Sequence, residues 1–298
     1  MRPLLPALGA AVLLLAGPAS AQTPADPAGP MLPDLEQAPP SNLLLTAGGP
    51  GEGATRYYLG FRSAVRNVGL GPLAISGRRR SRTSAAMSAT QLVQRADGAV
   101  ERVPGVGRLR YVVSPDHRHW HLLGFDRYTL RRADGGRTVR RDRKTGFCLG
   151  DRYRTLAPLA GPSPATPAFT SNCGLRQPGL LNISEGISVG YGDAYAGNLE
   201  GQYLRLDGLR GGRYVLAHEV NVGRLLRESR YDNNAASLLL DLRWRGGEPS
   251  VRVLASCEHS TSCTATGKTG RDATTATVAR AASRSFYCRL GAAPTPVS

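Results

Sequence analysis

Three histidines at alternate positions are the part of this sequence with the clearest capacity for chemistry. They lie in the segment His117-Arg118-His119-Trp120-His121, and they are three of the five histidines in the chain. In an extended strand, alternate side chains project from the same face, so three imidazoles would converge. Neutral imidazole binds copper and zinc well, and three ligands leave coordination positions open to water or a substrate. The pattern therefore predicts a metal site for copper or zinc, and a purely structural role is the alternative.

Lysine is rare in this chain, which makes each lysine a candidate for a specific role. Lys144 and Lys268 are the two lysines among 38 basic residues. Lys144 stands just before Phe147-Cys148-Leu149, an apolar run typical of a strand. Taken alone, a lysine in such a place is most often a solvated loop cation. A chemical role for Lys144 therefore needs support from other residues.

Five stretches of the sequence, in order between residues 32 and 244, resemble the lysyl oxidase family. They are Leu32-Pro33-Asp34-Leu35; His117-Arg118-His119-Trp120-His121 followed by Phe125 and Tyr128; Lys144-Thr145-Gly146-Phe147-Cys148-Leu149; Gly190-Tyr191-Gly192-Asp193-Ala194-Tyr195 followed by Gly201-Gln202-Tyr203; and Gly212-Arg213-Tyr214-Val215-Leu216 followed by Val220-Asn221, Glu228-Ser229 and Asn233-Asn234. The shared order of these motifs makes the resemblance specific.

The resemblance implies a secreted copper-dependent amine oxidase. Copper would be held by His117, His119 and His121, and a lysine tyrosylquinone would form from Lys144 and Tyr195. A primary amine, such as peptidyl lysine, would condense with a quinone carbonyl, lose a proton from the carbon next to nitrogen and leave as an aldehyde. Oxygen would reoxidise the cofactor, with release of hydrogen peroxide and ammonia.

Asp193 is the candidate base for this proton transfer. It precedes Tyr195 by two positions, so the two side chains would share one face of a strand. The alternative is an aspartate that stabilises a turn beside Gly192.

Three other functions account for parts of the sequence. A non-catalytic secreted β-domain that binds copper or zinc would need the histidines but neither Lys144 nor Tyr195. A wall-associated adhesion protein would leave the histidines unexplained. A zinc hydrolase would need a general base, and no glutamate adjoins the histidine segment. The amine oxidase therefore explains more of these residues than the alternatives do.

The charge of the chain bears on its partners. It has 38 basic and 22 acidic residues, and its formal net charge is +16. Such a surface repels free cationic amines and attracts acidic proteins. No recognition motif accompanies the arginine runs, so no specific nucleic-acid partner is predicted.

A lysine-bearing extracellular or envelope protein and a small primary amine remain as substrates. The animal members of the family have many more cysteines in this region, and Tyr191 stands where they carry one. The resemblance therefore does not imply a role in processing collagen, and the oligomeric state stays open.

The N-terminal residues predict export. The order of Arg2, the apolar run 4–15 and Ala19-Ser20-Ala21 is typical of a signal peptide at residues 1–21. The run is too short to span a bilayer, and no later segment is apolar enough. We therefore expect an extracellular or periplasmic protein without a membrane span.

Disulfides are expected in such an oxidising compartment. We predict that Cys148 pairs with Cys173, and Cys257 with either Cys263 or Cys288.

The elements that must position these residues are mostly strands. The apolar residues alternate with a period of two around Leu59, along Tyr214-Val220 and along Leu238-Trp244. Gly211-Gly212 predicts a hairpin between the run around Tyr203 to Leu206 and the strand that follows the glycines. We expect a mainly β, antiparallel sandwich-like single domain with few helices and long loops. The predicted divisions are an extended N-terminal segment at 22–55, the lysyl oxidase-like catalytic domain at 56–257 and a low-complexity C-terminal tail at 258–298.

Overall fold

The computed structural model describes residues 29–48, 55–114, 117–141, 146–199, 201–265 and 275–277. The predicted signal peptide, Lys144, Cys288 and most of the predicted C-terminal tail lie outside these ranges. Within them the secondary structure consists of strands, and every strand pairing is antiparallel. These observations confirm the mainly β, antiparallel prediction.

Eighteen strands make up the described part of the chain. They are β1 (Pro30–Met31), β2 (Leu35–Gln37), β3 (Ser41–Gly48), β4 (Arg56–Asn67), β5 (Leu73–Arg78), β6 (Ala86–Arg95), β7 (Val100–Val113), β8 (Arg118–Leu122), β9 (Asp126–Arg132), β10 (Thr138–Arg141), β11 (Tyr153–Arg154), β12 (Asn182–Ile187), β13 (Tyr191–Tyr195), β14 (Tyr203–Arg205), β15 (Gly212–Val220), β16 (Ala235–Arg245), β17 (Glu248–Glu258) and β18 (Thr275–Thr277). Among the described residues, no helix has the length and apolar character needed to cross a membrane.

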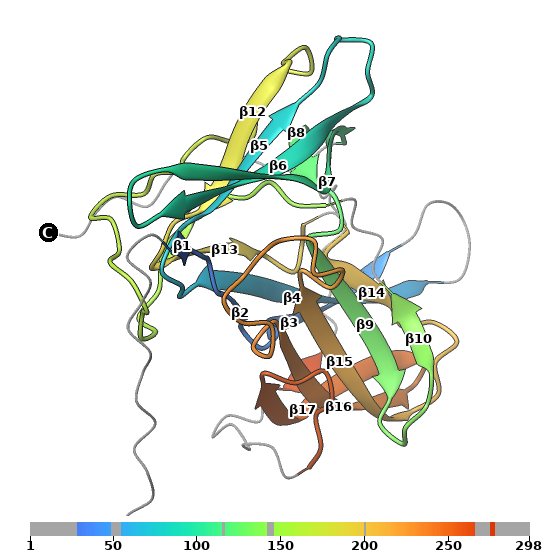
Figure 1. Cartoon of the computed structure of the whole chain (residues 1–298). Helices are drawn as coiled ribbons and strands as arrows, with labels where there is room; N and C mark the ends of the chain where they lie inside the picture. The colour runs from blue at the N-terminus through green and yellow to red at the C-terminus, as the bar shows by residue number, and fades with distance from the viewer. Residues whose placement is uncertain are drawn as a thin grey trace, which may run out of the picture.

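The strands form three sheets arranged as layers (Figure 1). The first sheet has the order β12-β5-β6-β7-β8, with β1 beside β6. The second has the order β10-β9-β15-β16-β17-β18. The third has the order β11-β13-β4-β14, with β2 and β3 also on β4, and it crosses the molecule between the other two (Figure 1). Side chains from all three sheets meet in one large buried cluster.

The long strand β4 organises the third sheet. It pairs with β13 and β14, and also with β2 and β3 from the predicted N-terminal segment. Leu59, Phe61 and Val65 are buried on it, as their spacing predicted. Gly60 allows the loop after β13 to approach, because a Cβ there would lie 2.1 Å from the carbonyl oxygen of Gly197. The loop that follows Tyr195 is therefore held against β4. The predicted domain boundaries stay predictions.

The predicted hairpin before residue 213 is wrong. Gly212 does begin β15, but β15 pairs with β16 and β9 rather than with β14. The strand β14 is only three residues long and pairs with β4. A glycine pair favours a turn but does not determine which strand becomes the partner, and the mostly buried β15 pairs with β16 on one edge and with β9 on the other. The alternating apolar side chains along β15 and β16 are mostly buried, as predicted.

Two disulfides connect loops to the sheets. Cys148 and Cys173 are bonded, with their Cα atoms 5.6 Å apart, which confirms the predicted pair. Cys257 is bonded to Cys263, with a Cα separation of 5.3 Å, and this decides between the two predicted partners. The second bond fixes the chain just beyond β17, where Cys263 is buried.

Candidate functional site

The three predicted metal ligands lie together in the structure. His119 and His121 belong to β8, and His117 immediately precedes it. One ligand atom from each of the three lies within 4.8 Å of the other two. Nδ1 of His117 is 3.3 Å from Nε2 of His119, and the ring centroids are 4.7 to 5.4 Å apart. The alternation of side chains along the strand therefore does bring the imidazoles to one point.

The opposite face of β8 holds the histidine strand in place. Trp120 is fully buried, and its indole N–H donates to the carbonyl of Gln177 at 3.2 Å. The guanidinium of Arg79 stacks 4.7 Å from the ring centroid of Trp120. On the edge of the sheet, β8 pairs with β7. Because Trp120 anchors one face, the histidines must project from the other.

The histidine cluster has the donor atoms that a copper or zinc ion requires. His117 and His121 are buried, and His119 is half-buried. The three donors are imidazole nitrogens, which bind both metals well. His117 and His121 also line a cavity of about 930 Å³, which gives water or a substrate access to the cluster. The residues present therefore fit a three-histidine metal site, and their role as ligands stays a prediction.

The segment after Lys144 runs directly beside the histidine strand. The N–H of Leu122 donates to the carbonyl of Phe147 at 2.8 Å, and the N–H of Phe147 donates back at 3.1 Å. Gly146 has φ +125°, and a Cβ there would lie 2.5 Å from the carbonyl oxygen of Leu122 and 3.2 Å from Cβ of His121. Lys144 itself lies outside the described residues, so its side chain cannot be compared with the prediction.

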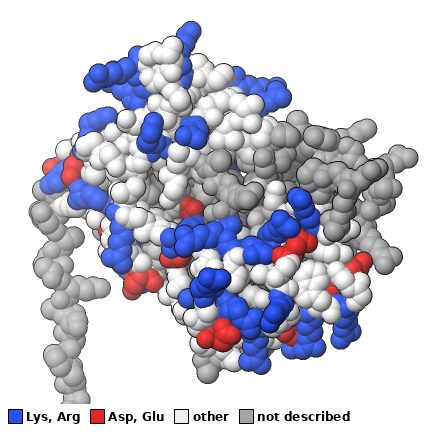
Figure 2. All heavy atoms as spheres, turned by 90° about the vertical axis from the view of Figure 1, so that its right-hand side faces the viewer, with Lys and Arg blue, Asp and Glu red and all other residues white. Residues whose placement is uncertain are grey.

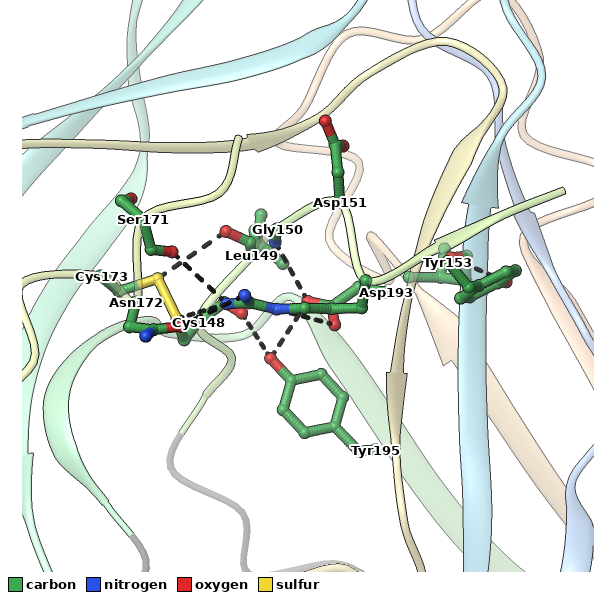
Figure 3. Close-up of polar contacts among 12 residues, drawn as sticks. Cys148, Leu149, Gly150, Asp151, Tyr153, Ser171, Asn172, Cys173, Asp193 and Tyr195 are labelled. Carbon is green, nitrogen blue, oxygen red and sulfur yellow. Dashed lines mark hydrogen bonds and ion pairs between the residues drawn. A yellow bond between two sulfur atoms is a disulfide. The ribbon is translucent and has the colours of Figure 1, made fainter. Parts of the chain in front are cut away.

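Tyr195 lies at the end of β13 and faces the same segment. Its hydroxyl donates to the carbonyl of Cys148 at 2.6 Å and lies 3.2 Å from Oδ2 of Asp193 (Figure 3). The ring of Phe147 packs edge-on against Tyr195, with centroids 4.9 Å apart. Burial, and then the nearby carboxyl groups of Asp193 and Glu185, raise the pKa of Tyr195 well above its usual value. Phe147 thus touches Tyr195 with its ring and the histidine strand with its backbone.

Asp193 lies within β13, opposite Val65 of β4, rather than in a turn. Its side chain is 2% exposed and shares the Tyr195 face, as the two-residue spacing predicted. The N–H of Gly150 donates to Oδ2 at 3.2 Å, and Nε of Arg152 lies 4.0 Å from Oδ1. Burial raises the pKa of Asp193 to about 7, although Arg152 and the hydrogen bonds lower it. A carboxyl with this pKa is suited to accept a proton near neutral pH.

Arg152 and Glu185 belong to the same site and were not predicted from the sequence. Besides its ion pair with Asp193, Arg152 contacts Sγ of Cys148 at 3.5 Å and donates to Oδ1 of Asn172 at 3.3 Å. Glu185 is fully buried on β12, with its carboxylate near both sulfurs of the Cys148 disulfide. Burial, and then the charge of Asp193, raise the pKa of Glu185 well above its usual value. Glu185 stands in a strand that also contains Asn182 and Ser184, so no local sequence pattern marked it as a buried residue.

Two other histidines and a buried carboxyl lie outside this site. His218 is a buried core residue, and its Nε2 contacts the carbonyl of Ala38. Burial lowers the pKa of His218 to about 3. His259 is paired with Glu36 at 3.0 Å. Glu228 accepts hydrogen bonds from the side chains of Asn221 and Asn234, and so forms a buried network rather than simple turn contacts.

Comparison with known proteins places this site in a family. A sequence model of the family described as lysyl oxidase matches residues 81–252, more than half of the chain. The chain belongs to the lysyl oxidase family. The match contains the histidine strand, Asp193 and Tyr195.

Several curated members of the lysyl oxidase family are similar to this chain. It is 26% identical to the protein-lysine 6-oxidase of Gallus gallus over 156 residues, which cover 50% of this chain and 31% of that protein. It is 26% identical to the Homo sapiens protein-lysine 6-oxidase over 153 residues, or 50% of this chain and 32% of the relative. For the Homo sapiens lysyl oxidase homolog 1, the identity is 25% over 138 residues, or 46% of this chain and 21% of the relative. The match spans a third or less of the length of these relatives.

Proposed function

We propose that this lysyl oxidase family member is a secreted copper amine oxidase. It oxidises primary amines, peptidyl lysine among them, to aldehydes. The overall reaction is RCH2NH2 + O2 + H2O → RCHO + NH3 + H2O2, in which the amine carbon loses two electrons to oxygen. The observation that carries the proposal is the convergence of His117, His119 and His121 on a strand whose backbone is bonded to Phe147, the residue that packs on Tyr195.

The three histidines would hold copper, and Lys144 and Tyr195 would be the precursors of a lysine tyrosylquinone. The lysyl oxidase family is in general copper-dependent and uses a quinone cofactor. Bound copper would supply the oxidation of a tyrosine, and the resulting quinone would supply an electrophilic carbonyl that accepts two electrons from the amine.

The residues around Tyr195 orient its ring, and one of them would accept the proton from the amine carbon. The carbonyl of Cys148 accepts the hydroxyl hydrogen of Tyr195 and so fixes the rotation of the phenol. Asp193 is the proposed base, and its carboxylate would take the proton from the amine carbon. Arg152 lies beside Oδ1 of that carboxylate, Gly150 donates to Oδ2, and both interactions lower the pKa of Asp193, which favours its ionised form. Arg152 is therefore a positioning residue.

Secretion is part of the proposal. The predicted signal peptide at residues 1–21 and the two disulfides both support an oxidising compartment outside the cytosol. The substrate is a lysine-bearing extracellular or envelope protein, or a small primary amine.

The decisive experiment is a search for the cross-link. The exported protein is purified with copper and oxygen, digested, and analysed by mass spectrometry for a peptide that joins the Lys144 and Tyr195 fragments. A reaction with phenylhydrazine gives an independent optical readout of the quinone carbonyl. Tyr195→Phe is the matched control, because it keeps the ring that packs on Phe147 and lacks the hydroxyl.

The same measurement separates the proposed enzyme from a metal-binding protein. The expected result is a cross-linked peptide and a phenylhydrazine adduct in the unaltered chain, with neither in the Tyr195→Phe variant. Stoichiometric copper without cross-link or adduct would instead identify a non-catalytic copper- or zinc-binding β-domain.

A further inference from the structure

Arginine is the most frequent residue type among the described residues that line the cavity beside the histidine cluster. The volume of the cavity is about 930 Å³. Its arginines belong to three strands, β4, β10 and β14, which come from two of the three sheets. These arginines are Arg56, Arg140, Arg141 and Arg205. Figure 2 looks onto the side of the molecule that carries β9, β10 and β14 in Figure 1, and there the described arginine side chains outnumber the acidic ones. A ligand that reaches the histidines thus passes through positive potential.

Among the described residues that line this cavity, the arginines outnumber the acidic groups. Asp207 is the acidic residue among the described lining residues, and its carboxylate already accepts from Arg205 at 2.8 Å and from the N–H of Tyr57 at 3.1 Å. None of the ion pairs among the described residues involves Arg56, Arg140 or Arg141. Within the described part of the chain, three arginines of the cavity therefore have no carboxylate paired with them.

Hydrogen bonds to the backbone hold the guanidinium of Arg140 in a fixed position in the wall of the cavity. This guanidinium is half-buried and donates to backbone carbonyls, at 2.7 Å to Val139 and 2.8 Å to Arg205, with a third bond to Asp207. Carbonyl oxygens fix the orientation of a guanidinium without neutralising it. A fixed arginine loses less freedom when it binds a carboxylate, and the pairing of two planar groups is specific.

The size of the cavity and its aromatic wall favour a chain segment over a small molecule. A cavity of about 930 Å³ is near the upper end of the range for drug-sized ligands. Tyr58 and Tyr203 line it and pack edge to face, with centroids 5.1 Å apart. Tyr203 is 41% exposed and offers an apolar surface to an aliphatic stem. A short alkylamine would leave most of this wall uncovered.

We propose that the cavity binds a protein segment whose reactive lysine is flanked by aspartate or glutamate residues. This inference rests on the proposed amine oxidase function and names its substrate class. The arginines attract the flanking carboxylates and so offset the repulsion between the cavity and the cationic lysine. A free small amine carries the same positive charge without the carboxylates. Such amines are therefore poor substrates for this protein.

The first test compares peptides of equal length that differ only beside a single lysine. Two glutamates flank the lysine in one peptide, two glutamines in the second and two arginines in the third, and butylamine serves as the small amine. The rate of hydrogen peroxide release gives kcat/KM for each. We expect the glutamate peptide to exceed the glutamine peptide about ten-fold at low salt, and the ratio to shrink as salt is added. Equal values for these two peptides would overturn the proposal.

The second test removes charge from the cavity. The double variant Arg56→Gln with Arg141→Gln replaces two charged side chains by neutral polar ones. Both positions are exposed, so the substitutions should leave the fold intact. The double variant should bring the preference for the glutamate peptide to within about two-fold of unity. The matched control is Arg245→Gln with Arg252→Gln, two exposed arginines of β16 and β17 that do not line the cavity. A control that lost the preference equally would show that only net charge matters.

A binding measurement distinguishes failure of this inference from failure of the proposed function. The glutamate peptide with its lysine replaced by glutamine cannot be oxidised, and its affinity is measured by fluorescence anisotropy. Binding by the unaltered chain that is lost in the cavity variant, without oxidation of any amine, would refute the amine oxidase and leave the acidic-segment site standing. Oxidation of all amines at similar rates, without specific binding, would refute the site and leave the oxidase.

Discussion

At Asp193, the position of one carboxyl determines how the site can respond to pH. The side chain is buried beside Tyr195, and its pKa is raised to about 7. The sequence predicted the shared face of Asp193 and Tyr195, since strand alternation alone dictates it. It could not predict Arg152 or Glu185, because their contacts with Asp193 and Cys148 arise only when the loop 148–152 and β12 fold against β13.

The first prediction concerns the proposed base. Asp193→Asn should lower kcat for amine oxidation about 100-fold or more, since a positioned general base typically contributes that much. In the unaltered enzyme, kcat/KM should rise as pH increases through about 7, because only the ionised carboxylate accepts a proton. Hydrogen peroxide release across pH 5 to about 9 measures both effects. A variant that kept this acid limb and most of its rate would exclude Asp193 as the base.

The second prediction concerns the metal ligands. His119→Ala should abolish both copper retention and formation of the phenylhydrazine-reactive group, since three imidazoles define the site. Copper is measured by atomic absorption after dialysis, so the readout does not depend on turnover. His259→Asn is the control: His259 is exposed on the protein surface with φ +54°, a conformation that asparagine tolerates. Normal maturation of the His119→Ala chain would mean that the ligand assignment is wrong.

At the scale of the elements, the pairing between β8 and the segment 146–149 brings two parts of the site together. Local patterns predicted the alternating face of β4 and the buried stripes of β15 and β16. They did not predict which strands are neighbours, and the hairpin expected before β15 was wrong for this reason. Pairing between strands far apart in sequence depends on burial of the complete sheet, which no short motif encodes.

The third prediction tests this pairing at Gly146. Gly146→Ala should lower the free energy of unfolding by about 3 kcal/mol, because it combines left-handed backbone strain with a contact at 2.5 Å to the carbonyl of Leu122. Gly98→Ala is the matched control, since Gly98 has φ +84° but open space around its Cβ position. It should cost only about 1 kcal/mol. Urea denaturation measures both, and equal costs would show that the close approach of Gly146 to β8 does not matter.

At the scale of the whole molecule, a buried network ties the N-terminal strands to the loop between β15 and β16. Oε2 of Glu228 accepts from the N–H of Leu35 at 2.7 Å, and Oε1 accepts from Asn221 at 2.6 Å and Asn234 at 2.7 Å. The partner Leu35 is 193 positions away from Glu228 in the sequence, so no local pattern predicts this contact. Only the folded chain reveals that these turn residues fasten the predicted N-terminal segment.

The fourth prediction follows from the titration of Glu228. Burial raises its pKa from 4.5 to about 7, although its hydrogen bonds lower it. Between these values the unfolded chain releases a proton that the folded chain keeps, so the contribution of Glu228 to stability is present below pH 4.5 and is lost as pH rises towards 7. The loss amounts to at most about 3 kcal/mol.

The test compares the unaltered chain with Glu228→Gln, which resembles the protonated acid but does not titrate. Urea unfolding at several pH values between 4 and about 8 gives the free energy of unfolding for each. The difference between the two chains should change over this interval and level off above it. A constant difference would contradict the assignment, since other buried carboxyls such as Glu185 are common to both.

Cys148 takes part in a disulfide and also fixes the position of Tyr195. Its sulfur closes a covalent loop with Cys173, while its carbonyl receives the phenol of Tyr195. A newly made chain whose thiols are still reduced would lack the clamp that holds this carbonyl in place. We therefore expect biogenesis to follow a fixed order, with thiol oxidation during export preceding modification of the tyrosine. Such an order would keep a reactive electrophile from arising inside the cell that makes it.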